Sequence, residues 1–176
     1  MTTPKTPRRL LVWLEDAQIA IDEGRFEDAE RALANVRRKR ADLPELALVE
    51  GDLAAARGDV DGAIERYREA AERDPEWPAP RLSEAWTELD RDDAEAALAI
   101  AEDVIEVFGE DPEARAEALL VAASAHLAEE DDEEARRCLE EVESIEIDDP
   151  ELLHELGRAW HELGDLEREE SAYRAI

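Results

Sequence analysis

Two short segments near the C-terminus begin with the histidine–glutamate pair of the zinc-protease motif HExxH. They are His154–Arg158 (HELGR) and His161–Asp165 (HELGD). The motif needs a second histidine one helical turn after the first, so that both imidazoles lie on one face and bind the metal. An arginine ends the first segment and an aspartate ends the second, and the two histidines lie seven residues apart. We therefore expect no zinc site here.

Two other features of the sequence invite a chemical interpretation. Glu129–Glu134 is an unbroken run of six acids. It lacks the central glycine of a calcium loop, so we interpret it as a solvated turn leading into a helix. Cys138 is the single cysteine, which excludes a disulfide framework and a cysteine-based zinc site. With no histidine placed to activate it, we expect no nucleophile. The sequence thus predicts no catalytic residue, no metal, no cofactor and no enzyme.

The charge of the chain limits its partners. Fifty acids and 21 bases give a net charge of −29, of which residues 1–41 carry +2 and residues 42–176 carry −31. Such a chain repels nucleic acid and anionic membranes, so we expect neither as a partner. The bases gather at Arg37–Arg40. They are interpreted as cations suited to a helix C-terminus, or as an anchor for an acidic partner such as another copy of the chain.

The N-terminus does not look like a secretion signal. Its apolar stretch LLVWL has five residues before Glu15, whereas a signal peptide needs about 7–15. We expect a cytoplasmic protein with a reduced thiol. Nineteen arginines against two lysines fit either a GC-rich genome or a salt-loving host.

A repeated turn organises the whole chain. Similar turns occur at Gly24, Gly58, Asp92, Glu130 and Gly164, with spacings of 34, 34, 38 and 34 residues. A fixed period in this range is the signature of a helical repeat array. The pattern predicts five units, the fourth lengthened by four residues.

Each unit reads as two helices joined by its turn. In the second unit, Pro44 suits the start of a helix, Gly58 ends it, and Asp59 suits the cap of the next helix, which Pro75 closes. No segment shows the alternation of a strand. The sequence predicts an all-α fold with an N-terminal tail over 1–9 and a single domain over 10–176. The repeats are expected at about 10–43, 44–77, 78–111, 112–149 and 150–176.

These residues resemble the tetratricopeptide repeat family. Small and aromatic side chains recur in phase in three units: Gly51, Gly58, Ala63, Tyr67, Ala70 and Pro75 in the second; Leu156, Gly157, Trp160, Gly164, Asp165 and Tyr173 in the fifth; Trp13, Ala17, Gly24, Phe26 and Ala29 in the first. The resemblance covers about residues 10–176. It implies a right-handed α–α superhelix, or solenoid, whose concave face holds a peptide or a helix of another protein and is lined by the first helix of each unit.

The resemblance lets us name the side chains expected to line that groove. They are Leu14, Gln18, Ile21, Leu48, Asp52, Leu82, Trp86, Leu89, Leu120, Ser124, Leu127, His154, Arg158 and His161, with Leu11 beside them. Most are apolar, and an exposed apolar stripe usually marks an interaction site. An equally weighted alternative is that some of these leucines are core residues between repeats. Chaperone-binding members hold a carboxylate with lysines and asparagines, which this groove lacks.

The third unit departs from the pattern. Strict alignment places Arg81, Glu84 and Glu88 at core positions, whereas a shift of one residue places Leu82, Ala85, Trp86 and Leu89 there. We favour the shifted register.

The sequence therefore predicts a non-enzymatic scaffold that binds an apolar peptide or an amphipathic helix of an unidentified protein. Because the chain ends at Ile176 with no solvating helix after the fifth unit, two alternatives remain. One is an accessory or N-terminal recognition module of a larger enzyme or complex, and the other is a self-assembling array.

Overall fold

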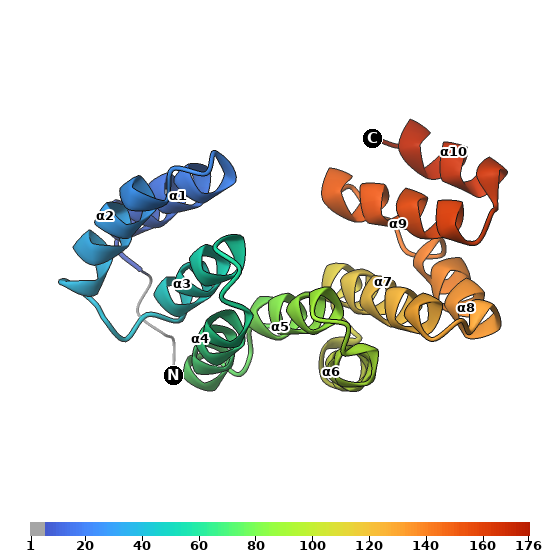
Figure 1. Ribbon diagram of the computed structural model, residues 1–176, viewed down its shortest axis with the longest axis horizontal. Coiled ribbons are helices and arrows are strands. Elements are labelled where there is room, and N and C mark those ends of the chain that lie inside the picture. The colour runs from blue at the N-terminus through green and yellow to red at the C-terminus, as the bar shows by residue number, and fades with distance from the viewer. Residues whose placement is uncertain (1–5) are drawn as a thin grey trace. The chain divides into compact units, whose positions relative to one another are not determined.

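The computed structural model describes residues 6–176 and contains ten helices in that range (Figure 1). They are α1 (Arg8–Asp22), α2 (Phe26–Arg37), α3 (Pro44–Ala56), α4 (Val60–Arg73), α5 (Ala79–Asp90), α6 (Ala94–Phe108), α7 (Pro112–Ala128), α8 (Asp132–Val142), α9 (Pro150–Glu162) and α10 (Leu166–Arg174). No strand occurs among the described residues, and the predicted all-α class is confirmed. In the same range, no helix combines the length and the apolar character needed to cross a membrane.

Each predicted repeat contains one pair of these helices. The first helix begins at Arg8, two residues before the predicted domain start, and residues 1–5 of the predicted tail lie outside the described part. The helices gather into two compact units: unit 1 extends to Pro80, and unit 2 is Arg81–Ile176. The single domain expected from the sequence stays a prediction, and the two units are described separately.

The turn inside every repeat has the same backbone conformation. Gly24, Gly58 and Gly164 have φ values of 70°, 78° and 72°, and Asp92 and Glu130 follow with 63° and 61°. A positive φ is favourable for glycine and costly for other residues. The five turn positions predicted from the period are therefore the five left-handed positions of the described chain.

An aspartate directly after the turn caps the second helix in four repeats. The carboxylates of Asp59, Asp93, Asp131 and Asp165 accept hydrogen bonds from the backbone N–H groups of Gly62, Ala96, Glu134 and Arg168. Each bond satisfies an N–H group that the first turn of a helix leaves unpaired. The turn and its cap thus specify where one helix ends and the next begins.

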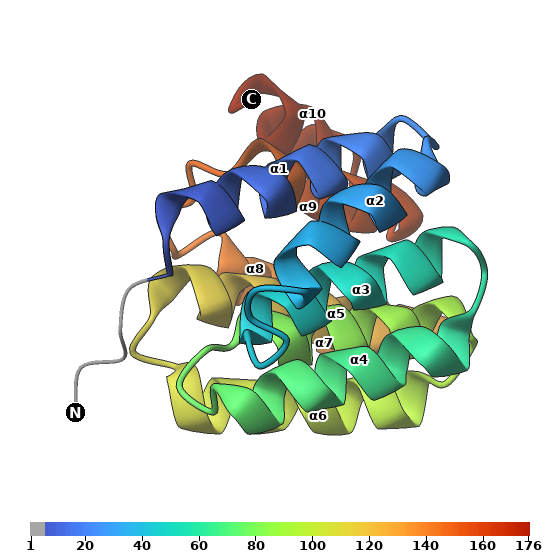
Figure 2. The ribbon, with the colours of Figure 1, turned by 90° about the vertical axis from the view of Figure 1, so that its left-hand side faces the viewer.

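Unit 1 has one core shared by its first three helices. Leu10 and Leu14 of α1, Leu33 of α2, and Leu46 and Leu53 of α3 belong to it. Figure 2 shows the stacking of α1 and α2 over α3, which agrees with the contacts of α1 with both helices. The first helices of neighbouring repeats therefore pack directly against each other.

Unit 2 has two apolar clusters. One joins Leu82 and Ala85 of α5 to Val104 of α6 and to α7. The other joins Leu139 of α8 to Trp160 of α9 and to α7. Leu82 and Ala85 of the shifted register are buried, but so are Glu84 and Glu88 of the strict register, while Trp86 and Leu89 are half-buried. Helix α5 is thus buried at core positions of both registers, and the shift in the third repeat stays a prediction.

Candidate partner-binding cleft

Four of the predicted groove leucines and isoleucines are core residues. Leu14 and Ile21 are buried in the core of unit 1, and Leu82 and Leu120 are buried in the clusters of unit 2. A first helix packs against both its own second helix and the neighbouring first helix, so much of its apolar surface is used inside the array. These four side chains leave the candidate surface, as the alternative interpretation of the stripe anticipates.

In unit 1, the remaining predicted residues include a small polar group. The Asp52 carboxylate accepts a hydrogen bond of 2.9 Å from the Tyr67 hydroxyl. Burial, opposed by this bond and aided by the charge of Asp22, raises the pKa of Asp52 to about 6. Gln18 donates to Asp22 at 3.4 Å, and Leu48 is half-buried. This face of unit 1 is therefore polar and acidic around Asp52, and its exposed apolar residue is Leu11, which is 41% exposed.

In unit 2, three of the predicted residues line one open cleft. Its volume is about 670 Å³, and it lies on the first helices α5, α7 and α9. Trp86, His154 and Arg158 come from the predicted set. The other lining residues are Asp90, Glu117, Pro150, Glu151, Leu152, Glu155 and Ile176.

Glu117 is one of the seven lining residues of this cleft that the sequence analysis missed. The Trp86 indole N–H donates to its carboxylate at 3.1 Å. Burial raises the pKa of Glu117 despite this bond, and the charges of Asp149, Glu113 and Glu151 raise it further. Glu117 lies one helical turn before the predicted groove position Leu120, so extending the stripe by one turn would have included it.

The remaining predicted residues of unit 2 do not line the cleft. Leu89 and Leu127 pack against the apolar clusters, and Ser124 is half-buried. His161 is exposed, and its Nδ1 lies 3.1 Å from a carboxylate oxygen of Glu169 on α10.

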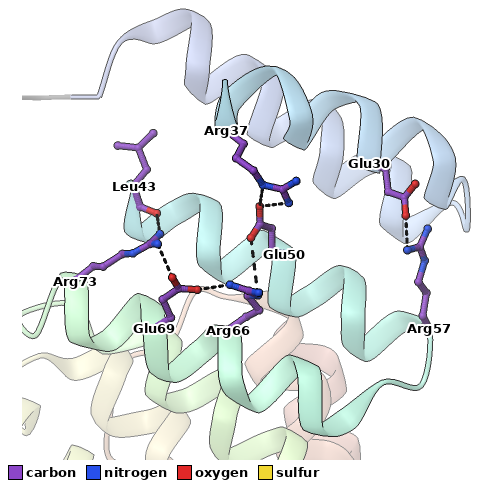
Figure 3. Close-up of polar contacts among 8 residues, drawn as sticks. All are labelled: Glu30, Arg37, Leu43, Glu50, Arg57, Arg66, Glu69 and Arg73. Carbon is purple, nitrogen blue, oxygen red and sulfur yellow. Dashed lines mark hydrogen bonds and ion pairs between the residues drawn. The ribbon is translucent and has the colours of Figure 1, made fainter. Parts of the chain in front are cut away.

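A second cleft, of about 580 Å³, lies among α2, α3 and α4 of unit 1 and contains none of the predicted groove residues. Figure 3 shows Glu30, Arg37, Glu50, Arg57 and Arg66 of this cleft paired with one another, beside further contacts of α4. Arg37 of α2 binds Glu50 of α3 at 2.6 Å, and Glu50 also faces Arg66 of α4 at 4.0 Å. Arg57 and Glu30 form a further pair at 2.5 Å. Arg37 and Arg57 therefore join the second helix of the first repeat to the second repeat, whereas Arg66 contacts Glu50 within the second repeat.

Three members of the Arg37–Arg40 cluster have partners within unit 1. Besides the Arg37 pair, Arg38 donates to Asn35, and Arg40 binds Asp42 at 2.8 Å. Arg37 is also the last residue of α2, where a cation faces the negative end of the helix dipole. These contacts favour the structural interpretation of the cluster over an anchor for an acidic partner.

Neither a metal cluster nor a reactive thiol emerges from the side chains of residues 6–176. No group of three or more potential metal ligands comes together in that range. Burial, with smaller contributions from Glu141 and Glu134, raises the pKa of Cys138 to about 11, so its thiol is protonated at neutral pH.

Comparison with known proteins identifies the repeat. Residues 14–78 match the sequence model of the tetratricopeptide repeat. A search of curated protein sequences gives no match. Among solved structures, the chain is similar to TTC0263, a thermophilic tetratricopeptide-repeat protein of Thermus thermophilus. They share 17% identity and a TM-score of 0.74 over 94% of this chain and 88% of that one.

Two further solved structures show the same kind of likeness. For pilF of Pseudomonas aeruginosa the identity is 12% and the TM-score 0.74, over 95% of this chain and 74% of that one. For MamA of Desulfovibrio magneticus the values are 17% and 0.62, over 96% and 93%. At these identities the likeness is one of fold, and it confirms the predicted helical-repeat class.

Proposed function

Since residues 14–78 match the tetratricopeptide repeat and the fold is that of helical-repeat proteins, we propose that this chain is a non-enzymatic scaffold that holds an amphipathic segment of a partner protein in the cleft of unit 2. The observation that carries the proposal is the cleft itself, which opens on three successive first helices, α5, α7 and α9. The fold as such supports protein binding, and the cleft supplies a defined place for it.

The size and the lining of the cleft suit a helical or extended segment. A volume of about 670 Å³ falls within the range of about 300–1,000 Å³ that is usual for ligand-binding pockets. Trp86, Pro150 and Ile176 supply apolar contact, and tryptophan is enriched among the residues that dominate binding energy. The apolar face of an amphipathic segment would pack against these side chains.

Blocking the cleft chemically at an exposed side chain tests the proposal. His154 is exposed and lines the cleft, so we would replace it with cysteine in a Cys138→Ala chain and couple a bulky maleimide to it. The matched control carries the same label at Val107→Cys, on the exposed side of α6. Circular dichroism would verify that both labelled chains keep their helices.

Affinity capture from native lysate then compares the two labelled chains. We expect a protein that is retained by the chain labelled at position 107 and lost from the chain labelled at position 154. A partner retained by both chains would contradict the assignment of the cleft. If the captured protein is the chain itself, the self-assembling array replaces the scaffold. If it is a subunit of an enzyme, the chain is an accessory module acting through the same cleft.

A further inference from the structure

The lining of the unit 2 cleft is strongly acidic. Asp90, Glu117, Glu151 and Glu155 face one arginine, Arg158. The guanidinium of Arg158 lies 2.6 Å from a Glu155 carboxylate oxygen. The cleft therefore has an excess of negative charge before any partner arrives.

Trp86 and Glu117 combine two features that favour a cation. The indole N–H of Trp86 is used by Glu117 at 3.1 Å, which holds the ring and the carboxylate next to each other. A cationic side chain over the ring would interact with its negative face, and the same cation would compensate the carboxylate. Burial and neighbouring acids disfavour the charge of Glu117 in the free chain, and the positive charge of a bound cation beside the carboxylate would offset this cost.

The charge of the whole unit points the same way. Unit 2 has eight arginines against 32 aspartates and glutamates, a net charge of −24, whereas unit 1 carries −5. A field of this sign attracts basic segments and repels acidic ones during encounter. The excess charge of the chain is thus concentrated in the unit that contains the cleft.

We propose that the cleft of unit 2 selects a basic amphipathic segment, with one lysine or arginine of the partner bound over the face of the Trp86 ring and beside the Glu117 carboxylate. The inference rests on the proposed function and adds the chemistry of the partner to it. The apolar face of the segment packs against Pro150 and Ile176, which are exposed, and its remaining cations face Asp90 and Glu151.

Two synthetic peptides test this chemistry on the full chain. One is an amphipathic helix of about four turns with leucines on one face and lysines on the other, and the second has glutamine in place of every lysine. Fluorescence anisotropy would measure their affinities for the native chain, for Glu117→Gln and for Glu106→Gln. Glu106 is an exposed acid of α6, so its variant matches the change in net charge. Glutamine at position 117 can still accept the Trp86 hydrogen bond.

We expect the lysine peptide to bind the native chain about tenfold more tightly than the glutamine peptide. Glu117→Gln should remove most of that advantage and leave the glutamine peptide unaffected, which also shows that the variant is folded. Glu106→Gln should change neither affinity appreciably. The label at position 154 should abolish both complexes.

Several results would overturn the inference in distinguishable ways. Equal affinities for the two peptides would refute selection of a basic segment and leave the proposed function intact. The affinity of the lysine peptide relative to the glutamine peptide could also fall equally in Glu117→Gln and Glu106→Gln. That result would show diffuse attraction of the peptide to an acidic surface and not binding at Glu117. If neither peptide binds, the proposed function fails, and the inference fails with it.

Discussion

Asp52 shows how the surroundings of one side chain set the stability of the fold. Its pKa is raised from 3.8 to about 6, mainly by burial. Between about pH 4 and pH 6, Asp52 is therefore protonated in the folded chain and ionised in the unfolded chain. The contribution of Asp52 to stability therefore falls as the pH rises from about 4 to 6, and its full cost is present above pH 6. We expect Asp52→Asn, whose amide oxygen can still accept from Tyr67, to raise the free energy of unfolding at pH 7 by about 2 kcal/mol.

The pH dependence separates this effect from a simple loss of negative charge. Denaturant unfolding should give equal stabilities for the native chain and Asp52→Asn below about pH 4, and a gap that opens up to about pH 6. Asp16→Asn, on the exposed side of α1, controls for removing one charge from an acidic chain. A gap that is constant from pH 4 to 7 would contradict the assignment to Asp52 ionisation.

Gly51 and Gly157 occupy equivalent positions in their repeats, but the tyrosine that packs against each glycine is buried in one case and partly exposed in the other. A Cβ at Gly51 would overlap the ring of Tyr67, which is buried, and a Cβ at Gly157 would overlap Tyr173, which is 37% exposed. Overpacking costs about 1–3 kcal/mol, whereas alanine gains up to about 1 kcal/mol over glycine inside a helix. We expect Gly51→Ala to destabilise the chain by about 2 kcal/mol and Gly157→Ala to be nearly neutral in urea unfolding. Equal losses would mean that Tyr173 is held as firmly as Tyr67.

The residue types of the cleft show what the sequence can predict. Trp86, His154 and Arg158 lie where their positions on the first helices place them. Leu120 does not, because an apolar side chain suits the groove and the core equally, and only the packing of α7 against its neighbours decides between them. Glu117 was missed because the predicted stripe of this helix began one turn later, at Leu120, and the acid type alone adds no signal in a chain with 50 acids.

The helical hairpin of each repeat is specified by two adjacent residues, the turn and the cap. In the fourth repeat, Glu130 has a φ of 61°, and the Asp131 carboxylate accepts from the Glu134 N–H at 3.2 Å. Glu130→Gly should stabilise the chain by about 1 kcal/mol, because glycine adopts this φ without strain. Asp131→Ala should destabilise it by about 1 kcal/mol through loss of the cap. Both changes remove one negative charge, so effects of the same sign in thermal unfolding would contradict the local explanation.

The turn residue and the capping residue of each repeat also explain why the helices could be predicted from the sequence. The period placed all five turns correctly although Asp92 and Glu130 replace glycine, because the spacing of the helices is fixed by packing and not by one residue type. The start of α1 was less predictable. It has no side-chain cap, and Pro7 precedes Arg8 without a capping hydrogen bond that the sequence could reveal.

Charge acts on the molecule as a whole. The net charge of −29 includes −24 in unit 2 alone, and like charges at this density oppose the compact state. Raising the ionic strength from 0.01 M to 0.1 M shortens the screening length from about 30 Å to about 10 Å, comparable to the spacing of neighbouring helices. We expect the melting temperature, measured by circular dichroism, to rise by a few degrees over this range, since about 1 kcal/mol corresponds to about 2–4 °C for a chain of this size.

A variant with fewer charges identifies self-repulsion as the cause of that rise. Glu106, Glu110 and Glu129 are exposed acids of unit 2, and glutamine at all three positions lowers its negative charge without touching either apolar cluster. If self-repulsion is responsible, this variant should melt higher than the native chain at 0.01 M salt and gain less from added salt, because less repulsion remains to be screened. A melting temperature that is flat or falls with salt, or an equal gain in both chains, would show that the ion pairs of the arginines outweigh the repulsion among the acids.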